Sequence, residues 1–129
     1  MNCVLLGDRH HGLSEAIRGL LETTFNAVFM VADAVSLVEG AARLQPELVV
    51  VDLALAGGDL PGLVGTLRKD ASSTRVLLLS AHDESAVALA ALAAGADGFV
   101  LKRLIAGELL EAIDALLAGD RYVSAGVVV

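Results

Sequence analysis

Leu48-Val49-Val50-Val51-Asp52 decides the fold, because four apolar residues, three of them β-branched, lead directly into a carboxylate. A short run of this composition predicts a strand that is buried on both of its faces. An ionised aspartate is not stable inside such a strand without a partner. It is stable at the carboxyl end, where an open parallel sheet has its binding crevice. We therefore expect Asp52 to be the reactive residue, with the ends of other strands converging on it.

The remainder of the chain alternates between short apolar runs and segments in which apolar residues recur at helical spacing. Strands that are separated by helices run parallel, and their crossovers are right-handed. The pattern therefore predicts an α/β three-layer sandwich. The predicted strands cover residues 3–6, 27–31, 48–51, 75–79 and 98–101, and the predicted helices cover residues 13–21, 34–44, 60–69, 85–94 and 106–117.

The composition limits the class of protein. A length of 129 residues suits one domain with its own core, and no uncharged run approaches the roughly 18–20 residues that span a bilayer. The first residues lack the basic segment of a signal peptide. A formal net charge of −7, with three Phe, one Tyr and no Trp, disfavours direct binding to nucleic acid. We expect a soluble cytoplasmic domain that contacts neither membranes nor nucleic acid directly.

Polar residues follow four of the predicted strands, and parallel strands place these residues at one edge of the sheet. They are Asp8, Asp52, Ser80 and Lys102. A carboxylate can attack phosphorus to form an acyl phosphate, and a hydroxyl and an ammonium can hold the phosphoryl oxygens. A second carboxylate helps to bind Mg²⁺, a hard cation that prefers oxygen ligands. The loop at 7–12 has neither the glycine fingerprint of a dinucleotide site nor the hydroxyl-rich phosphate loop of a flavin site. The pattern therefore favours a phosphoryl-accepting site.

The order and spacing of these segments resemble the receiver domain of two-component response regulators, in particular the subfamily fused to LuxR-type DNA-binding domains. The resemblance lies in residues 4–10, 48–53, 76–82, 94–102, 108–113 and 119–124. It implies a flavodoxin-like fold whose five-stranded parallel sheet has the order 2-1-3-4-5. It also implies a receiver domain over residues 1–124, with the start of a linker or tail at 125–129. Such a domain is a regulator rather than an enzyme in the ordinary sense, and its implied partner is a histidine kinase.

The resemblance also assigns roles to individual residues. It makes Asp52 the phosphoacceptor, Ser80 the switch hydroxyl, Lys102 the phosphoryl-binding lysine and Phe99 the switch aromatic. In the family, the hydroxyl moves toward the new phosphoryl group. The aromatic ring then turns into the space that the hydroxyl has left, and the outer face of the domain changes shape.

The sequence departs from the family at the expected metal site. The resemblance implies that Mg²⁺ is held by Asp8, Asp52 and the backbone carbonyl of Ala54. The family usually has a second acid directly after the first, but Arg9 occupies that position here. A lost ligand together with a permanent positive charge weakens the binding of a divalent cation. The prolines usual in the loop after the phosphoacceptor and after the lysine are also absent, where this chain has Ala56 and Arg103.

Two hypotheses therefore remain open. In the first, Asp52 is phosphorylated by a histidine kinase, and Arg9 partly substitutes for the metal. In the second, the chain is a pseudo-receiver, in which Arg9 and Lys102 pair with Asp8 and Asp52 and lock one conformation. Output would then depend on binding alone.

A partner surface is expected around the helix at 85–94, because that segment carries no charged residue on any side. A surface helix normally has a polar side, and a helix without one is usually covered. The resemblance places the usual signalling surface on the fourth helix, fifth strand and fifth helix. We expect a homodimer partner or an output domain there, on Val87, Leu89, Leu92 and Phe99. The apolar ending at 127–129 fits a linker or a segment that docks on a partner.

Overall fold

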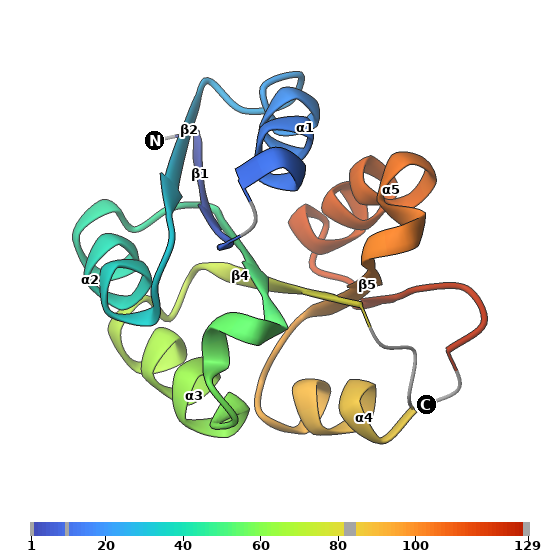
Figure 1. Cartoon of the computed structure of the whole chain (residues 1–129). Helices are drawn as coiled ribbons and strands as arrows, with labels where there is room; N and C mark the ends of the chain where they lie inside the picture. The colour runs from blue at the N-terminus through green and yellow to red at the C-terminus, as the bar shows by residue number, and fades with distance from the viewer. Residues whose placement is uncertain (1, 10, 82–84, 128–129) are drawn as a thin grey trace.

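The computed structural model describes residues 2–9, 11–81 and 85–127. Strands and helices alternate along these residues, as the apolar pattern predicts (Figure 1). The strands are β1 (Cys3–Gly7), β2 (Ala27–Val31), β3 (Leu48–Asp52), β4 (Arg75–Ser80), β5 (Gly98–Leu101) and β6 (Tyr122–Val123). The α-helices are α1 (His11–Leu21), α2 (Ala34–Leu44), α3 (Leu60–Asp70), α4 (Ser85–Ala93) and α5 (Ile105–Leu117), and short 3₁₀ helices lie at η1 (Leu53–Ala56) and η2 (Lys102–Leu104).

The sheet confirms the predicted topology and extends it. Its strand order within the described residues is β2-β1-β3-β4-β5-β6, and each neighbouring pair is parallel. The order 2-1-3-4-5 is therefore confirmed, whereas the short strand β6 was not predicted. Two residues are too few to show a periodic pattern, and β6 is defined only by its pairing with β5.

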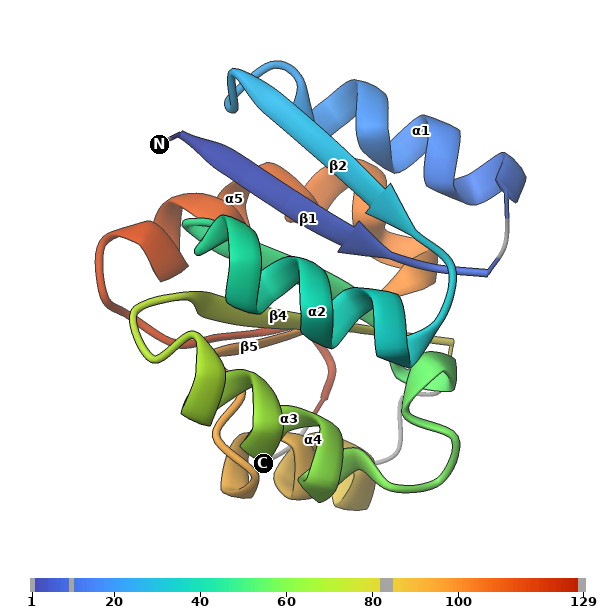
Figure 2. The same cartoon turned by 90° about the vertical axis from the view of Figure 1, so that its left-hand side faces the viewer.

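Helices cover both faces of the sheet, so the predicted three-layer sandwich is confirmed. Figure 2 shows α1 and α5 on one face and α2, α3 and α4 on the other. Successive residues of a strand point to opposite faces, and the core accordingly splits into two clusters. Leu5, Val49 and Val51 pack with α2, α3 and α4, whereas Leu6 and Val50 pack with α1 and α5.

Aspartate caps fix the beginning of two helices. At the start of α2, Asp33 accepts a hydrogen bond from the amide of Ser36 at 2.7 Å. At the start of α3, Asp59 accepts one from the amide of Gly62 at 3.1 Å. A side-chain oxygen at this position satisfies an amide that has no partner within the helix. The start of α1 was predicted less well, because the helix begins at His11 rather than at Leu13.

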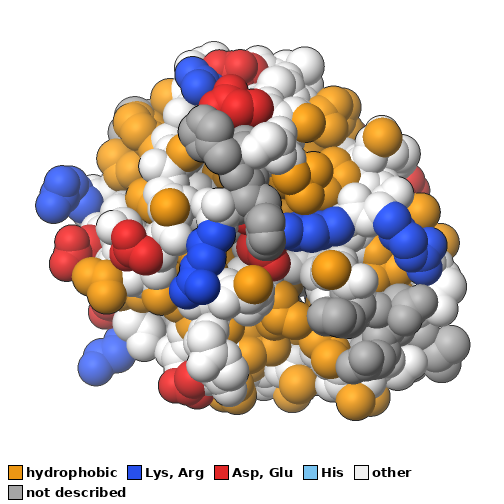
Figure 3. Space-filling model, in the orientation of Figure 1, with side chains coloured by type: hydrophobic (Ala, Val, Ile, Leu, Met, Phe, Trp, Pro, Cys, Tyr) orange, Lys and Arg blue, Asp and Glu red, His pale blue; other side chains and the backbone are white. Residues whose placement is uncertain are grey.

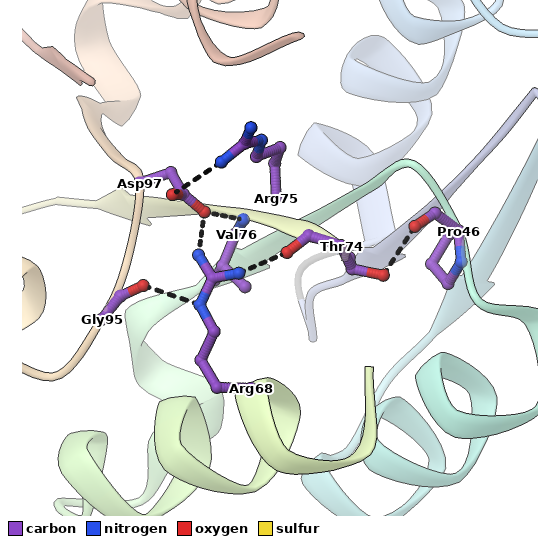
Figure 4. A network of polar contacts seen from close by, with 7 residues as sticks. All are labelled: Pro46, Arg68, Thr74, Arg75, Val76, Gly95 and Asp97. Carbon is purple, nitrogen blue, oxygen red and sulfur yellow. Dashed lines mark hydrogen bonds and ion pairs between the residues drawn. The ribbon is translucent and has the colours of Figure 1, made fainter. Parts of the chain in front are cut away.

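The amino-terminal edge of the sheet is tied together by one polar network (Figure 4). Arg68 on α3 donates to the carbonyl of Gly95 at 2.9 Å and to that of Thr74 at 2.5 Å, and it forms an ion pair with Asp97. Asp97 also accepts the amide of Val76 at 2.8 Å. The network therefore links α3, the start of β4 and the turn before β5, at the edge opposite the candidate site.

None of the helices in the described ranges is both long enough and apolar enough to span a membrane.

Candidate functional site

The candidate site lies at the carboxyl edge of the sheet, which faces the viewer in Figure 1. Asp8 directly follows β1, and Asp52 and Ser80 are the last residues of β3 and β4. Lys102 directly follows β5 and begins η2. All four residues lie at strand ends, and they share one edge because every strand of a parallel sheet has its carboxyl end on the same side.

The ammonium of Lys102 joins the two carboxylates. Its Nζ forms a hydrogen bond and ion pair with Oδ2 of Asp52, and it lies 3.6 Å from Oδ2 of Asp8. The side chains of Asp8 and Asp52 are 0% and 5% exposed, so these charges are largely removed from water. Figure 3 shows this face of the molecule, with acidic side chains near its centre between Lys and Arg side chains. Buried carboxylates need such a partner, and Lys102 supplies it.

Asp52 is held as a carboxylate. Burial alone would raise its pKa. The hydrogen bond from Lys102 and the amide of Ala54, which donates to Oδ1 at 3.0 Å, outweigh burial and lower the pKa of Asp52 below its ordinary value. The group is therefore ionised at neutral pH, the form in which a carboxylate acts as a nucleophile.

Ser80 and Phe99 are both buried, in β4 and β5, the two strands that come after β3 in the sheet order. Ser80 is 1% exposed and pairs in register with Leu101 of β5, while the preceding Leu79 pairs with Asp52. Phe99 is fully buried in the core cluster that faces α2, α3 and α4. The sheet thus brings the predicted switch hydroxyl to the same edge as the carboxylates and places the predicted aromatic in the core behind it.

The oxygen donors expected for Mg²⁺ are only partly gathered. The carboxylates of Asp8 and Asp52 lie together, but the carbonyl of Ala54 accepts the amide of Gly57 at 3.3 Å within the turn of η1. Within the described part of the chain, no group of three or more His, Cys, Asp or Glu residues is placed to hold a metal ion. The oxygen ligands that are gathered here are therefore the two carboxylates, and the ammonium of Lys102 contacts both of them.

Arg9 lies apart from the two carboxylates. Its side chain is exposed. The pKa of Asp33, the cap of α2, is lowered mainly by the hydrogen bonds that Asp33 accepts from Ser36, and the positive charge of Arg9 adds a smaller effect in the same direction. Across residues 2–9, 11–81 and 85–127, no hydrogen bond or ion pair joins Arg9 to Asp8 or Asp52. The pseudo-receiver hypothesis paired both Arg9 and Lys102 with these residues. The described residues show the pairing of Lys102 but not that of Arg9. Adjacent chain positions do not fix the direction of a long, flexible side chain.

The expected partner surface needs one correction. Leu89 is 51% exposed on α4, and Val87 and Leu92 are half-buried. Phe99 is fully buried, so it cannot contribute to an exposed surface in this conformation. A strand between two layers of helices buries both of its faces, which the resemblance alone did not make explicit.

A shallow apolar groove of about 340 Å³ runs beside this surface, between η1 and α4. Its lining residues are small or apolar, and they are Leu53, Ala56, Gly58, Leu60, Ala86, Val87 and Ala90.

Sequence reasoning missed two polar residues near β5. Ser124 is 2% exposed, and its hydroxyl both accepts the amide of Leu101 and donates to Glu108. Residues 119–124 belong to the stretch that resembles receiver domains, but nothing in their order indicates which group the serine meets. The only available signal is a lone hydroxyl after two strand-forming residues, Tyr122 and Val123.

Comparisons with known proteins agree with this geometry. The family model described as "Response regulator receiver domain" matches residues 4–114. The chain is 31% identical over 123 residues to the nitrate/nitrite response regulator protein NarP of Escherichia coli K12, covering 94% of this chain and 57% of NarP. The chain spans little more than half the length of the curated relatives that it matches.

Solved structures show the same likeness. The crystal structure of a LuxR-family two-component response regulator from Aurantimonas sp. SI85-9A1 matches with a TM-score of 0.88 and 32% identity, over 98% of this chain and 92% of that one. RcsB of Salmonella enterica serovar Typhimurium, bound to the promoter P1flhDC in the presence of phosphomimetic BeF3−, matches with a TM-score of 0.81 and 25% identity, over 98% of this chain and 64% of RcsB.

Proposed function

The chain belongs to the response regulator receiver domain family, and we propose that Asp52 accepts a phosphoryl group from a histidine kinase. The observation that carries this proposal is the contact of one ammonium, that of Lys102, with the carboxylates of both Asp52 and Asp8. A structural ion pair needs one acid and one base. Two buried acids around one base therefore differ from a simple structural pair, and clusters of interacting ionisable groups in a cleft are typical of functional sites.

The proposed reaction transfers the phosphoryl group from nitrogen to oxygen. A carboxylate oxygen of Asp52 attacks phosphorus, the bond from phosphorus to the imidazole nitrogen of the kinase breaks, and that nitrogen keeps the electron pair and takes up a proton. The product is an acyl phosphate on Asp52. Lys102 stabilises the charge on the phosphoryl oxygens, and the hydroxyl of Ser80 donates to one of them.

The donor set fits a weak Mg²⁺ site. Mg²⁺ is commonly held by one or two carboxylates and the phosphoryl group while it keeps several waters, and Asp8 and Asp52 supply the two carboxylates here. Bound Mg²⁺ would neutralise charge on the phosphoryl oxygens. Lys102 already lies between the two acids, and Arg9 replaces a family ligand with a positive charge. We therefore propose a lower affinity for Mg²⁺ than in receivers with two adjacent acids.

The proposed output is a change of shape on the face formed by α4, β5 and α5. The new phosphoryl group draws Ser80 toward it, and Phe99 repacks in the space that opens beside it. Leu89 and its neighbours on α4 then contact a second receiver or an output domain. Because the relatives are longer than this chain, and because RcsB was solved on promoter DNA, we propose that any contact with DNA belongs to an output domain rather than to the receiver.

Phosphorylation by a small phosphodonor tests the proposal. The protein is incubated with acetyl phosphate over a series of Mg²⁺ concentrations, and its intact mass is measured. We expect a gain of one phosphoryl group in the wild type and in Asp59→Asn, a matched control at a helix cap. We expect no gain in Asp52→Asn. A wild-type protein that gains no mass at any Mg²⁺ concentration would refute the proposal, and so would a gain that persists in Asp52→Asn.

A further inference from the structure

Residues 122–124 close the outer edge of β5. Strand β6 pairs with β5 in parallel, with Gly98 opposite Tyr122 and Phe99 opposite Val123. The amide of Ser124 donates to the carbonyl of Phe99 at 2.9 Å. Figure 1 shows this segment in red, running from the end of α5 past β5. The strand that leads into Lys102 is therefore held on both sides, by β4 and by β6 with Ser124.

Beyond the backbone pairing of β5 with β6, the side chain of Ser124 accepts the next hydrogen bond from β5. The amide of Leu101 donates to Oγ of Ser124 at 2.8 Å. Leu101 is 1% exposed, so water does not reach this amide readily. A buried amide without an acceptor is costly, and the hydroxyl replaces the carbonyl that a longer β6 would supply.

Glu108, in the first turn of α5, orients that hydroxyl. Oγ of Ser124 donates to Oε1 of Glu108 at 2.6 Å, and the amide of Ala125 donates to Oε2 at 3.3 Å. A hydroxyl can donate one hydrogen bond, and here it donates to the carboxylate, so an oxygen lone pair is directed at the amide of Leu101. Hydrogen bonds to a charged group are stronger than neutral ones, and consecutive bonds reinforce each other.

The chain of contacts ends at the candidate site. Leu101 directly precedes Lys102, whose Nζ contacts Asp52 and Asp8. The side chain of Lys102 is only 13% exposed, and its ammonium is in contact with both carboxylates. A shift of the backbone at the end of β5 therefore moves the point from which this packed side chain reaches them. We propose that Ser124, oriented by Glu108, is a positioning residue that fixes the end of β5 and thereby directs Lys102 toward the phosphoryl group on Asp52. This inference rests on the proposed phosphorylation of Asp52.

The coupling also acts in the opposite direction, because linkage between two sites is reciprocal. A phosphoryl group that pulls on Lys102 changes the hydrogen bond between Leu101 and Ser124. Beyond Ser124, the side chain of Val127 packs against the core cluster that contains Phe99. The state of Asp52 is thus transmitted to the segment at 122–127.

The test compares rates of phosphorylation by acetyl phosphate, measured by intact mass. We expect Ser124→Ala to slow the reaction by about fivefold, the effect of losing one buried hydrogen bond, and Ser124→Thr, which keeps the hydroxyl, to restore it to within about twofold. Thr74→Ala is the matched control, because Thr74 is also 2% exposed and its hydroxyl donates to the carbonyl of Pro46 at the opposite edge of the sheet. A rate in Ser124→Ala equal to that in Thr74→Ala would overturn the inference.

A second measurement separates this inference from the proposed function. The NMR signal of the Lys102 methylene next to the ammonium is recorded without any phosphodonor in the wild type, Ser124→Ala and Thr74→Ala. We expect the signal to move in Ser124→Ala alone, because a general loss of stability does not redirect Lys102. An unchanged signal in Ser124→Ala would overturn the positioning role even if Asp52 is phosphorylated. If the wild type accepts no phosphoryl group but the Lys102 signal moves in Ser124→Ala as expected, only the proposed function is refuted.

Discussion

Arg68→Ala removes the centre of the network at the amino-terminal edge of the sheet. Three donors of the guanidinium contact the carbonyls of Gly95 and Thr74 and the carboxylate of Asp97 (Figure 4). The alanine variant leaves both carbonyls without this donor. Asp97 then keeps only the amide of Val76 and the weaker ion pair with Arg75 among the contacts of this network. We expect the variant to fold but to be clearly less stable than the wild type.

The magnitude follows from burial and from the contacts that remain. Breaking a fully buried ion pair costs about 3–5 kcal/mol, and a hydrogen bond to a charged group contributes about 1.5–3 kcal/mol. The side chains of Arg68 and Asp97 are 26% and 16% exposed, so water compensates for part of the loss. Nη1 of Arg75 also remains 3.7 Å from Asp97. We therefore expect the free energy of unfolding to fall by about 2–3 kcal/mol.

Equilibrium unfolding in urea measures this loss. With an m value of about 2 kcal/mol per molar urea, the midpoint should fall by about 1–1.5 M. Arg43→Ala is the matched control, because Arg43 lies in an exposed position near the end of α2. Its midpoint should change by less than about 0.3 M, since exposed substitutions usually cost under about 0.5 kcal/mol. Equal midpoints for the two variants would refute the reasoning, because they would show that the network adds no stability.

Three further predictions follow from other parts of the structure. The pKa of Asp52 is lower in the folded chain than in the unfolded chain, so its stabilising contribution is present above about pH 4 and is lost as the pH falls further. Unfolding in urea at a series of acidic pH values should therefore show a free energy of unfolding that falls with pH. Asp52→Asn should reduce this dependence on pH. Burial, the charges of Glu108 and Glu111, and a hydrogen bond with Glu108 raise the pKa of Tyr122 to about 12. Because Tyr122 is the only tyrosine in the chain, tyrosinate absorbance should give this value directly and a lower one in Glu108→Gln. An unchanged titration in that variant would contradict the influence of Glu108 on Tyr122. Leu89→Glu should leave the unfolding midpoint unchanged, since the side chain is 51% exposed, but should weaken self-association in sedimentation experiments; unaltered association would exclude this part of α4 from the partner surface.

The extent of the fold that could be predicted depended on the length of each signal. Leu48-Val49-Val50-Val51-Asp52 predicts a buried strand with a polar end, and β3 covers these residues. The caps Asp33 and Asp59 predict helix starts that the structure confirms. Strand β6 escaped prediction because it has two residues and exists only through its pairing with β5.

The candidate site could be predicted in its membership but only partly in its geometry. The sequence places Asp8, Asp52, Ser80 and Lys102 at strand ends, and a parallel sheet must bring those ends to one edge. It does not show that Lys102 reaches both carboxylates, or that Arg9 is exposed and forms no ion pair with them among the described residues. These directions depend on the packing of long side chains against neighbours that are distant in the sequence.

The sequence by itself determined the order of the elements, the parallel sheet and the edge at which the polar groups gather. These properties follow from local patterns of apolar, β-branched and capping residues, which act over a few neighbouring positions. Only the tertiary structure decided which charges pair, since Arg68 meets Asp97 across 29 positions and Lys102 meets Asp52 across 50. Such contacts depend on the spacing and burial of packed layers. The chain order alone therefore left open both the ion pairs of the site and the hydrogen bonds of Ser124 behind it.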